Sequence, residues 1–318
     1  MAELLLELYS EEIPPQLQIE ARSQLKQFIE NSFKENHLKY KDLTVYSSPT
    51  RLTLYAKNLS EKIQIDAKEI KGPKVGSPDQ VLQGFIKAKS VSEKDLIEKE
   101  TEKGKFFFIK TQPQAILTED LLKKIVPKAI ESINWKRSMR WSDHNLMWGR
   151  PLRSIFARFN NNKLLFKFDH LETNDEVIIE QDLIIKTKKI KNFAEYLALL
   201  KSHEIIVDHE EREKIILKKI NSVAKSKQYK EHLNPKLLEE VVNIVEDPNL
   251  LLVNFNKDYL KIPQEIIIST LEKNQRYFPI FDSRDRLTNY FFVIANKKDE
   301  KKLITEGNKR VVEARLAD

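Results

Sequence analysis

The stretch KRSMRWSDHNLMWGRPLRSIFARF, Lys136 to Phe159, holds two of the chain's three tryptophans, and the third directly precedes it. Its five arginines are interleaved with aromatic residues: Arg137, Arg140, Arg150, Arg153 and Arg158 lie among Trp141, Trp148 and Phe156. A guanidinium group can hold a phosphate through two hydrogen bonds and can stack on a ring or a base. This pattern is therefore typical of a groove that binds single-stranded or loop RNA.

A structural role explains the same residues. In this interpretation the tryptophans are buried in the hydrophobic core, and the arginines lie around them in solvent. Taken alone, the stretch favours this second interpretation, because large aromatic side chains are mostly buried in folded proteins. The rest of the chain has to decide between the two.

Length and composition limit the classes of protein to consider. A chain of 318 residues exceeds what one core usually supports, so we expect two domains, residues 1–170 with the Trp/Arg stretch and residues 171–318. The net charge of +7 mildly favours an anionic partner. The chain has no cysteine, which excludes disulfides and thiolate metal sites, and its six histidines show no HExxH spacing. We therefore expect no bound metal.

The sequence shows no sign of a membrane protein. No apolar segment approaches about 18 residues, and the N-terminal segment carries Glu3 and Glu7 in place of a basic signal region. We expect a cytoplasmic protein without membrane contact.

Before the Trp/Arg stretch, the pattern predicts strands and helices in mixed order. The run ELLLELY at 3–9 indicates a buried strand that ends before Pro14 and Pro15, and the apolar spacing from Gln16 indicates an amphipathic helix. Further elements expected here are two strands over Val45 to Ala56 with Arg51 beside their turn, a strand within 62–71, a loop over KGPKVGSP at 71–78, a helix at 79–89, a short helix from Ser92, an aromatic strand in EKGKFFFIK, and a helix from Thr118.

After the stretch, helices become more frequent. RSIFARF and KLLFKF flank Asn160 to Asn162 and predict a β-hairpin. Further elements expected are a β-rich piece at 176–187, helices at 192–201, 208–227 and 236–245, a strand at 250–255, a helix opened by Pro263, strands at 277–282 and 288–295, and a final helix within 300–318. No stop signal ends that last helix, so we expect a longer parent chain. The order predicts an α+β fold of mixed antiparallel sheets with packed helices.

Motifs for catalysis are missing from the sequence. It contains no GxxxxGK[ST], GxGxxG or GxSxG, and acid pairs such as Glu239-Glu240 are adjacent and point different ways. The remaining segments that suggest a function are rich in cationic residues. KNQRYF places Gln275 and Arg276 between a helix end and a strand, where Arg276 either contacts a ligand or neutralises the helix C-terminus. GNKRVVEAR places Arg310 and Arg315 on one helix, which is otherwise a charged solvent face.

Several segments, taken in chain order, resemble the β subunit of bacterial heterotetrameric glycyl-tRNA synthetase. They are LLLELYSEEIPP, SPTRL, KGP, Gly84-Phe85, EKGKFFF, MRW at 139–141, RP at 150–151, LLEEVVNIVEDP, YLKIPQEIIISTLEKNQRYFPIFD, FFVIANK and GNKRVVEARLAD. The last four are the most specific, and the resemblance extends over all 318 residues. The family usually carries a Gly-His-Arg-Phe segment after the hairpin, and TNDEVIIEQDLII at 173–185 departs from it.

This resemblance implies an N-terminal fragment of such a β subunit, without the family's HD-like and anticodon-binding regions. It implies that residues 171–318 include a domain similar to the B3/B4 module of phenylalanyl-tRNA synthetase. Glycine activation with ATP and Mg²⁺ would belong to the α subunit, so the fragment would have no catalytic residue and no cofactor of its own. The implied partners are the α subunit, a second β subunit in an α2β2 tetramer, and tRNA-Gly.

The main hypothesis is therefore a tRNA-recognition and subunit-assembly part of glycine-tRNA ligase. Its candidate tRNA-binding residues are Arg137, Arg140, Trp141, Arg150, Arg153, Gln275, Arg276, Arg310 and Arg315. With the resemblance, RNA contact and core packing become equally supported for the Trp/Arg stretch. Two alternatives stay open: a hydrolytic editing module for mis-charged tRNA, as B3/B4 domains are elsewhere, and a scaffold that only holds the α dimer.

Overall fold

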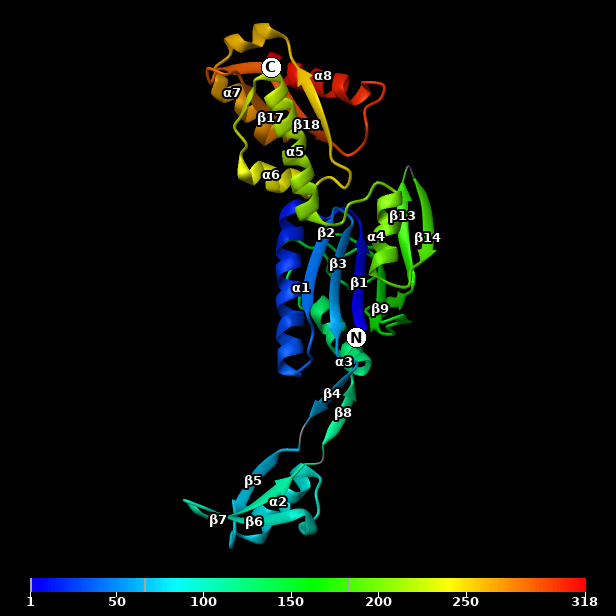
Figure 1. The fold of residues 1–318 in the computed structure, drawn as a ribbon, viewed down its shortest axis with the longest axis vertical. Coiled ribbons are helices and arrows are strands. Elements are labelled where there is room, and N and C mark those ends of the chain that lie inside the picture. The colour runs from blue at the N-terminus through cyan, green and yellow to red at the C-terminus, as the bar shows by residue number, and fades with distance from the viewer. Residues whose placement is uncertain (1, 66, 112, 182) are drawn as a thin grey trace.

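The computed structural model describes residues 2–65, 67–111, 113–181 and 183–318. Figure 1 shows three parts arranged along the long axis: a central sheet that contains the N-terminus, a C-terminal lobe at one end, and a small lobe at the other. The small lobe is reached through a two-stranded stalk, in which β4 (Lys62–Ile65) pairs with β8 (Gln114–Leu117). The fold is mixed α+β with antiparallel sheets and packed helices, as predicted.

The central sheet is built around β1 (Ala2–Ser10). This strand pairs antiparallel with β3 (Arg51–Leu59) and with β9 (Leu152–Phe159), and β2 (Asp42–Ser48) extends the sheet beyond β3. The run of leucines is buried on both faces, because successive side chains of a strand point to opposite sides. Alternate leucines of β1 pack with α1 (Pro15–Glu35) and α3 (Thr118–Glu131) on one face, whereas Leu5 belongs to the core on the other.

The second face of the sheet is covered by residues that follow the Trp/Arg stretch. Strand β12 (Leu171–Asn174) joins the sheet parallel to β9, and β13 (Glu176–Gln181) with β14 (Ile184–Lys189) and α4 (Phe193–Ser202) supplies the core around Leu5 and Phe156. Residues on both sides of position 170 therefore share one core.

The C-terminal lobe is a four-stranded antiparallel sheet between two layers of helices. The strand order is β15 (Lys230–Glu231), β17 (Phe278–Phe281), β18 (Leu287–Ala295) and β16 (Asn249–Asn254). Alternation along β18 directs Phe292 toward α5 (His209–Lys227) and α6 (Pro235–Val242), and Phe291 toward α7 (Gln264–Ser269) and α8 (Leu303–Ala317). A short helix η2 (Lys257–Lys261) and a π-helix η3 (Thr270–Asn274) complete the lobe.

The small lobe consists of β5 (Glu69–Lys74), β7 (Gly104–Lys110) and β6 (Leu96–Thr101) in that order, with α2 (Asp79–Lys89) and the single turn η1 (Glu93–Asp95). The predicted loop at 71–78 is wrong for its first half, because β5 continues to Lys74. Gly72 and Pro73 are accommodated by an irregularity between Lys71 and Lys74, on a strand at the edge of the sheet. Edge strands and bulges are where a sheet tolerates proline.

The hairpin predicted after Pro151 is shorter than expected. Strand β10 (Asn162–Lys163) pairs with β9 through only two residue pairs, and β11 (Lys167–Phe168) pairs instead with β12. Leu164 still donates its backbone N–H to the carbonyl oxygen of Ala157 in β9, and its side chain is buried in the core. Leu164, Phe166 and Phe168 of KLLFKF thus pack against the core, where the pattern predicted a paired strand, and Leu165 is exposed.

Candidate nucleic-acid interface

The Trp/Arg loop, residues 132–151 between α3 and β9, is fixed to the central core by two tryptophans. Trp148 is only 2% exposed, and its ring centroid lies 4.9 Å from that of Trp135. An isolated bridge joins the backbones of Met139 and Trp148. Gly149 passes so close to Trp135 that an added Cβ would lie 2.5 Å from its Cε3 atom. Trp135 and Trp148 therefore have the core-packing role that the second interpretation of the stretch predicted for the tryptophans.

Trp141 has a different environment, in a cluster with two histidines. The rings of His144 and His170 are stacked with centroids 3.6 Å apart and an angle of 2° between the planes. Trp141 is half-buried and meets both rings edge-on, at 6.4 Å and 6.0 Å. Asp169 Oδ2 lies 2.6 Å from His170 Nδ1, and this hydrogen bond lowers the pKa of the Asp169 carboxyl. The cluster holds the middle of the loop against the turn between β11 and β12.

The loop presents two unpaired cations beside this cluster. Arg137 and Arg140 are exposed, and no hydrogen bond or ion pair joins either side chain to another described residue. Arg150 is half-buried and donates to the carbonyl oxygen of Gly149 at 2.7 Å. Free guanidinium groups keep all their donors for an anionic ligand, so Arg137 and Arg140 can bind phosphate without first breaking an internal ion pair.

Arg153 takes part in an internal network of charged side chains. This network lies on one face of the central sheet, and the Trp/Arg loop packs against the core on the opposite face. Its Nη1 lies 2.6 Å from Glu180 Oε2 and 3.2 Å from Glu11 Oε1, and its guanidinium lies 5.4 Å from the Tyr9 ring centroid. The hydrogen bond from Arg153 lowers the pKa of the Glu180 carboxyl. Contact with RNA would have to compete with this pair, so Arg153 is a weaker candidate than Arg137 or Arg140.

Gln275 and Arg276 lie in the C-terminal lobe, away from the Trp/Arg loop (Figure 1). Arg276 has a φ of +60° and donates to the carbonyl oxygen of Lys273 at the end of η3. Its Nε also lies 2.9 Å from Glu240 Oε1 on α6. The guanidinium thus satisfies a helix-end carbonyl and links two helices, which is the local role considered for it in the sequence. Gln275 is half-buried beside it.

Arg310 and Arg315 are exposed on α8, and no described residue pairs with either. The start of β17 is joined to α8 by a hydrogen bond from the Tyr277 hydroxyl to Asn308 Oδ1. The candidates therefore form two groups, one on the central sheet and its Trp/Arg loop and one on the C-terminal lobe. The structure does not bring all nine into one site.

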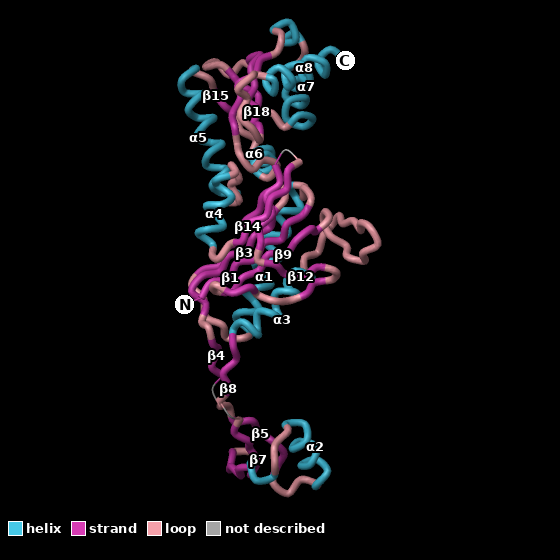
Figure 2. Tube along the Cα trace, turned by 90° about the vertical axis from the view of Figure 1, so that its right-hand side faces the viewer, coloured by secondary structure: helices cyan, strands magenta, loops and turns pink. Residues whose placement is uncertain are grey.

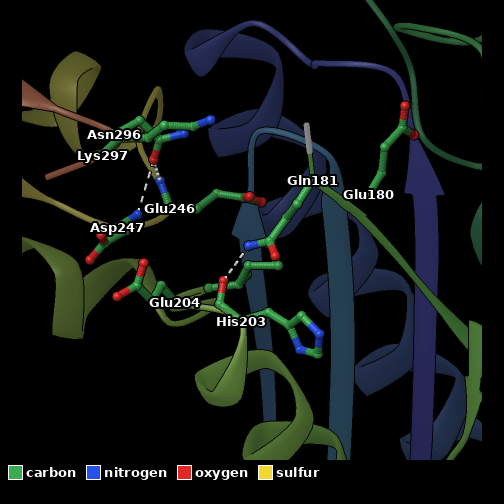
Figure 3. Close-up of a pocket in the computed structure, with 9 residues that line it drawn as sticks. Glu180, Gln181, His203, Glu204, Glu246, Asp247, Asn296 and Lys297 are labelled. Carbon is green, nitrogen blue, oxygen red and sulfur yellow. Dashed lines mark hydrogen bonds between the residues drawn. The ribbon is translucent and has the colours of Figure 1, made fainter. Parts of the chain in front are cut away.

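A cavity of about 310 Å³ lies at the seam between these two parts (Figure 3). Gln181 Nε2 donates to the carbonyl oxygen of His203 at 2.6 Å, and Asn296 Oδ1 accepts from the backbone N–H groups of Glu246 and Asp247 at 2.7 Å and 3.0 Å. Acidic side chains line much of it, so it does not suit a phosphate. Among the described residues there is no group of three or more acidic, histidine or cysteine side chains arranged to hold a metal ion.

A charged cluster lies on the face of the central sheet that β13 and α4 cover, and no local sequence pattern predicted it. Glu7 and Arg51 are each 1% exposed, with Glu7 Oε2 3.8 Å from Arg51 Nε. The hydroxyl of Tyr196 donates to Glu7 Oε2 at 2.5 Å, and burial raises the pKa of the Glu7 carboxyl. Arg51 also donates to the carbonyl oxygen of Ile178 at 2.6 Å. These groups are buried and bonded to one another, so the role of the cluster is structural: it links β1, β3, β13 and α4.

Residues 4–318 match the family model described as "Glycyl-tRNA synthetase beta subunit". The chain is 35% identical over 319 residues to the glycine–tRNA ligase β subunit of Rickettsia typhi, covering 100% of this chain and 48% of the relative. It is 33% identical over 321 residues to that of Dictyoglomus thermophilum, covering 99% of this chain and 47% of the relative.

These relatives are subunits of an aminoacyl-tRNA synthetase. The chain belongs to the glycyl-tRNA synthetase β-subunit family. It spans about half the length of the curated relatives it matches. In the part of the chain that the structure describes, no helix is long and apolar enough to cross a membrane.

Proposed function

We propose that this chain is the tRNA-contacting and subunit-assembling part of a glycine-tRNA ligase. In this proposal glycine activation, with ATP and Mg²⁺, takes place on a separate α subunit, and the chain works in the cytoplasm within an α2β2 tetramer. The expected likeness of the second half of the chain to the B3/B4 module of phenylalanyl-tRNA synthetase is part of the same proposal.

The observation that carries the proposal is the match to the β-subunit family over residues 4–318. The structure supports a binding role through Arg137 and Arg140, which are exposed and unpaired on a loop held rigidly by Trp148. A rigid support favours precise contacts, since little conformational freedom is lost when the ligand binds. Arg310 and Arg315 offer a second cationic surface on the C-terminal lobe.

The test is binding of tRNA-Gly to this chain over a range of salt concentrations. We expect weak binding that falls steeply with salt, because each phosphate contact releases counterions. Replacing Arg137 and Arg140 by Gln should lower the affinity and reduce the salt slope by about 0.7–0.9 per lost contact. Arg153→Gln serves as the internal comparison, because that side chain is already paired with Glu180.

Three other results would change the proposal. Absence of tRNA binding at low salt, with intact binding of the α subunit, would leave the scaffold alternative. Release of amino acid from mis-charged glycine tRNA by this chain would favour the editing alternative. Binding that does not respond to salt would argue against phosphate contact altogether.

A further inference from the structure

The small lobe has a sheet that is covered by a helix on one face only. Helix α2 lies over the face toward which Gly72 points, because a Cβ on Gly72 would lie 2.7 Å from Cε1 of Phe85 in α2. Figure 2 shows α2 on one side of β5 and β7, with no helix on their other side. The opposite face of this sheet, the open face, is thus available to solvent.

Strand alternation sorts the charges between the two faces. Paired residues of an antiparallel sheet share a face, and β7 in the middle pairs with both neighbours. Phe106 pairs with Lys99 and Lys74, and Phe108 pairs with Ile97 and Lys71. These residues, together with Glu69 and Lys110, form the open face: Glu69, Lys71, Lys74, Ile97, Lys99, Phe106, Phe108 and Lys110. The acidic residues Glu98 and Glu100 of β6 alternate to the other face.

The open face is therefore two phenylalanine rings surrounded by lysines. Lys71 Nζ lies 3.5 Å from the Phe106 ring centroid, and Lys99 Nζ lies 5.9 Å from that of Phe108. Its one acidic side chain, Glu69, is paired with Lys99 at 2.5 Å. Both rings are half-buried. A face with four lysines and one neutralised carboxylate is complementary to a polyanion.

We propose that this open face binds unpaired RNA, with bases stacked on Phe106 and Phe108 and phosphates held by the surrounding lysines. Residues two apart on a strand are separated by roughly 6.8 Å, which suits neighbouring nucleotides whose bases are splayed apart. Aromatic side chains on an uncovered sheet are a general way to bind single-stranded RNA, because every base has a face that can stack.

The cation on Phe106 does not oppose this binding. An ammonium group over a ring that solvent can reach is held more weakly than a stacked base. When a base stacks on Phe106, the Lys71 ammonium group can move from the ring to the neighbouring phosphate. Lys71 then has a favourable partner for its charge both with and without bound RNA. The same exchange is open to Lys99 at Phe108, although it must also leave Glu69.

This inference rests on the proposed function only for the source of the RNA, which would be an unpaired part of tRNA. The small lobe stands at the end of the β4–β8 stalk, at the opposite end of the molecule from the C-terminal lobe (Figure 1). The open face would then give a tRNA that is held at the Trp/Arg loop a second contact, on a separate lobe of the chain.

The test uses the whole chain with a short fluorescent oligouridylate, with an RNA duplex of equal length, and with tRNA-Gly. Replacing Phe106 and Phe108 together by Leu keeps apolar bulk but removes the stacking faces. We expect the affinity for oligouridylate to fall roughly tenfold or more, with little change for the duplex. Replacing both by Tyr should restore binding. Lys71→Gln with Lys110→Gln should reduce the salt slope by about 0.7 per lost phosphate contact.

The matched control is Lys87→Gln with Lys89→Gln, which removes the same charge from α2 on the other side of the lobe and should leave binding unchanged. Circular dichroism of each variant checks that the lobe is folded. Equal oligouridylate binding by the wild type, the Leu pair and the Tyr pair would overturn the inference. So would loss of α-subunit binding, with RNA binding intact, in the Leu pair.

The two proposals fail in different ways. If tRNA-Gly does not bind while oligouridylate binds in a Phe-dependent manner, the proposed function falls and the stacking surface stands. If replacing Arg137 and Arg140 lowers tRNA affinity while the Leu pair changes no RNA affinity, the proposed function stands and the stacking surface falls.

Discussion

At the scale of single residues, Gly149 shows how closely the Trp/Arg loop is packed. The ring of Trp135 occupies the space where a Cβ would be, and that ring in turn contacts Trp148. In the sequence this glycine is part of Gly-Arg-Pro, which indicates a turn and gives no sign of the contact. Glycine is needed here because the backbone passes close to the Trp135 ring. The backbone conformation does not require it, since Gly149 has no positive φ.

We predict that Gly149→Ala destabilises the chain by about 1–3 kcal/mol, the usual effect of an added carbon in a well-packed site. The free energy of unfolding in urea measures this, and near-UV circular dichroism reports on the displaced tryptophans. Gly307→Ala is the control, because Gly307 lies within α8 and, apart from its chain neighbours and the backbone of its own helix, no atom would lie within 4 Å of its Cβ. That change should stabilise by up to about 1 kcal/mol. Equal effects of the two changes would contradict the packing argument.

His209 carries a second prediction at this scale. Burial, with Arg22 and Arg212 nearby, lowers its pKa to about 4, while Asp208 acts in the opposite direction. Between about pH 6.5 and 4 the unfolded chain binds more protons at this position than the folded chain. The contribution of His209 to the free energy of unfolding is therefore fully present above pH 6.5 and is lost as the pH falls toward 4.

The pKa shift of His209 sets an upper limit of about 3 kcal/mol on this contribution to stability, and partial exposure of the ring reduces the contribution to roughly 1–2 kcal/mol. His209→Gln should flatten this part of the pH profile. Carboxyl groups also titrate in this range, so the quantity to compare is the difference between wild type and variant at each pH. A difference that stays constant from pH 4 to 7 would exclude the effect.

At the scale of elements, the junction between η3 and β17 decides the role of Arg276. The side chain bonds to Lys273 O and to Glu240, and both partners belong to helices of the same lobe. We predict that Arg276→Lys, which keeps the charge but loses the planar fork, lowers stability by less than about 1 kcal/mol and leaves tRNA affinity unchanged. Thermal unfolding and tRNA titration measure the two quantities. Reduced tRNA affinity with unchanged stability would instead assign Arg276 to the RNA surface.

Elements with a strong local signal were predictable from the sequence. The leucine run of β1, the helix α2 and the capped helix α5, whose Asp208 side chain accepts from two backbone N–H groups, all lie where the pattern predicts them. The π-helix η3 was not predictable, because its sequence, TLEKN, is also an ordinary helical one. Strand β5 was hidden by Gly72 and Pro73, which mark loops except at the edge of a sheet.

The candidate site was predictable only in part, for a similar reason. The exposed Arg137 and Arg140 were identified, because they are close to Trp141 in the sequence. His170 lies far from His144 in the sequence and reaches it only through the β11–β12 turn, so no local pattern could pair them. The internal partner of Arg153, Glu180, is likewise distant along the chain, and the two meet only because β13 packs over the face of the central sheet that carries Arg153.

At the scale of the whole molecule, the central sheet and the C-terminal lobe are joined by a buried arginine. Arg212 is 0% exposed, and burial lowers its pKa to about 10, so it is still charged at neutral pH. Its guanidinium donates to three carbonyl oxygens: Ser47 of β2 at 2.8 Å, Ile206 of the connecting segment at 2.5 Å, and Val242 of α6 at 2.9 Å. One side chain thus contacts both parts and the link between them.

A second contact lies beside it and uses the end of α6. Asn243 accepts from Gln18 of α1 through its backbone carbonyl at 2.7 Å and from Arg22 through its side chain at 2.8 Å. The bond from Gln18 is buried and the bond from Arg22 is part-buried, so both are strong only while every group is satisfied. Loss of one donor should therefore weaken the joint as a whole.

We predict that Arg212→Met destabilises the chain by roughly 3–5 kcal/mol, because three carbonyl groups lose a charged donor inside the protein. The loss should fall on the joint between the lobes, since each lobe keeps its own apolar core. Scanning calorimetry should then show two separated transitions in place of one cooperative transition. Arg286→Met is the control, because Arg286 is 70% exposed and pairs with Asp282 within its own turn. A single transition lowered in temperature, with no separation, would mean that Arg212 stabilises one lobe and does not couple the two.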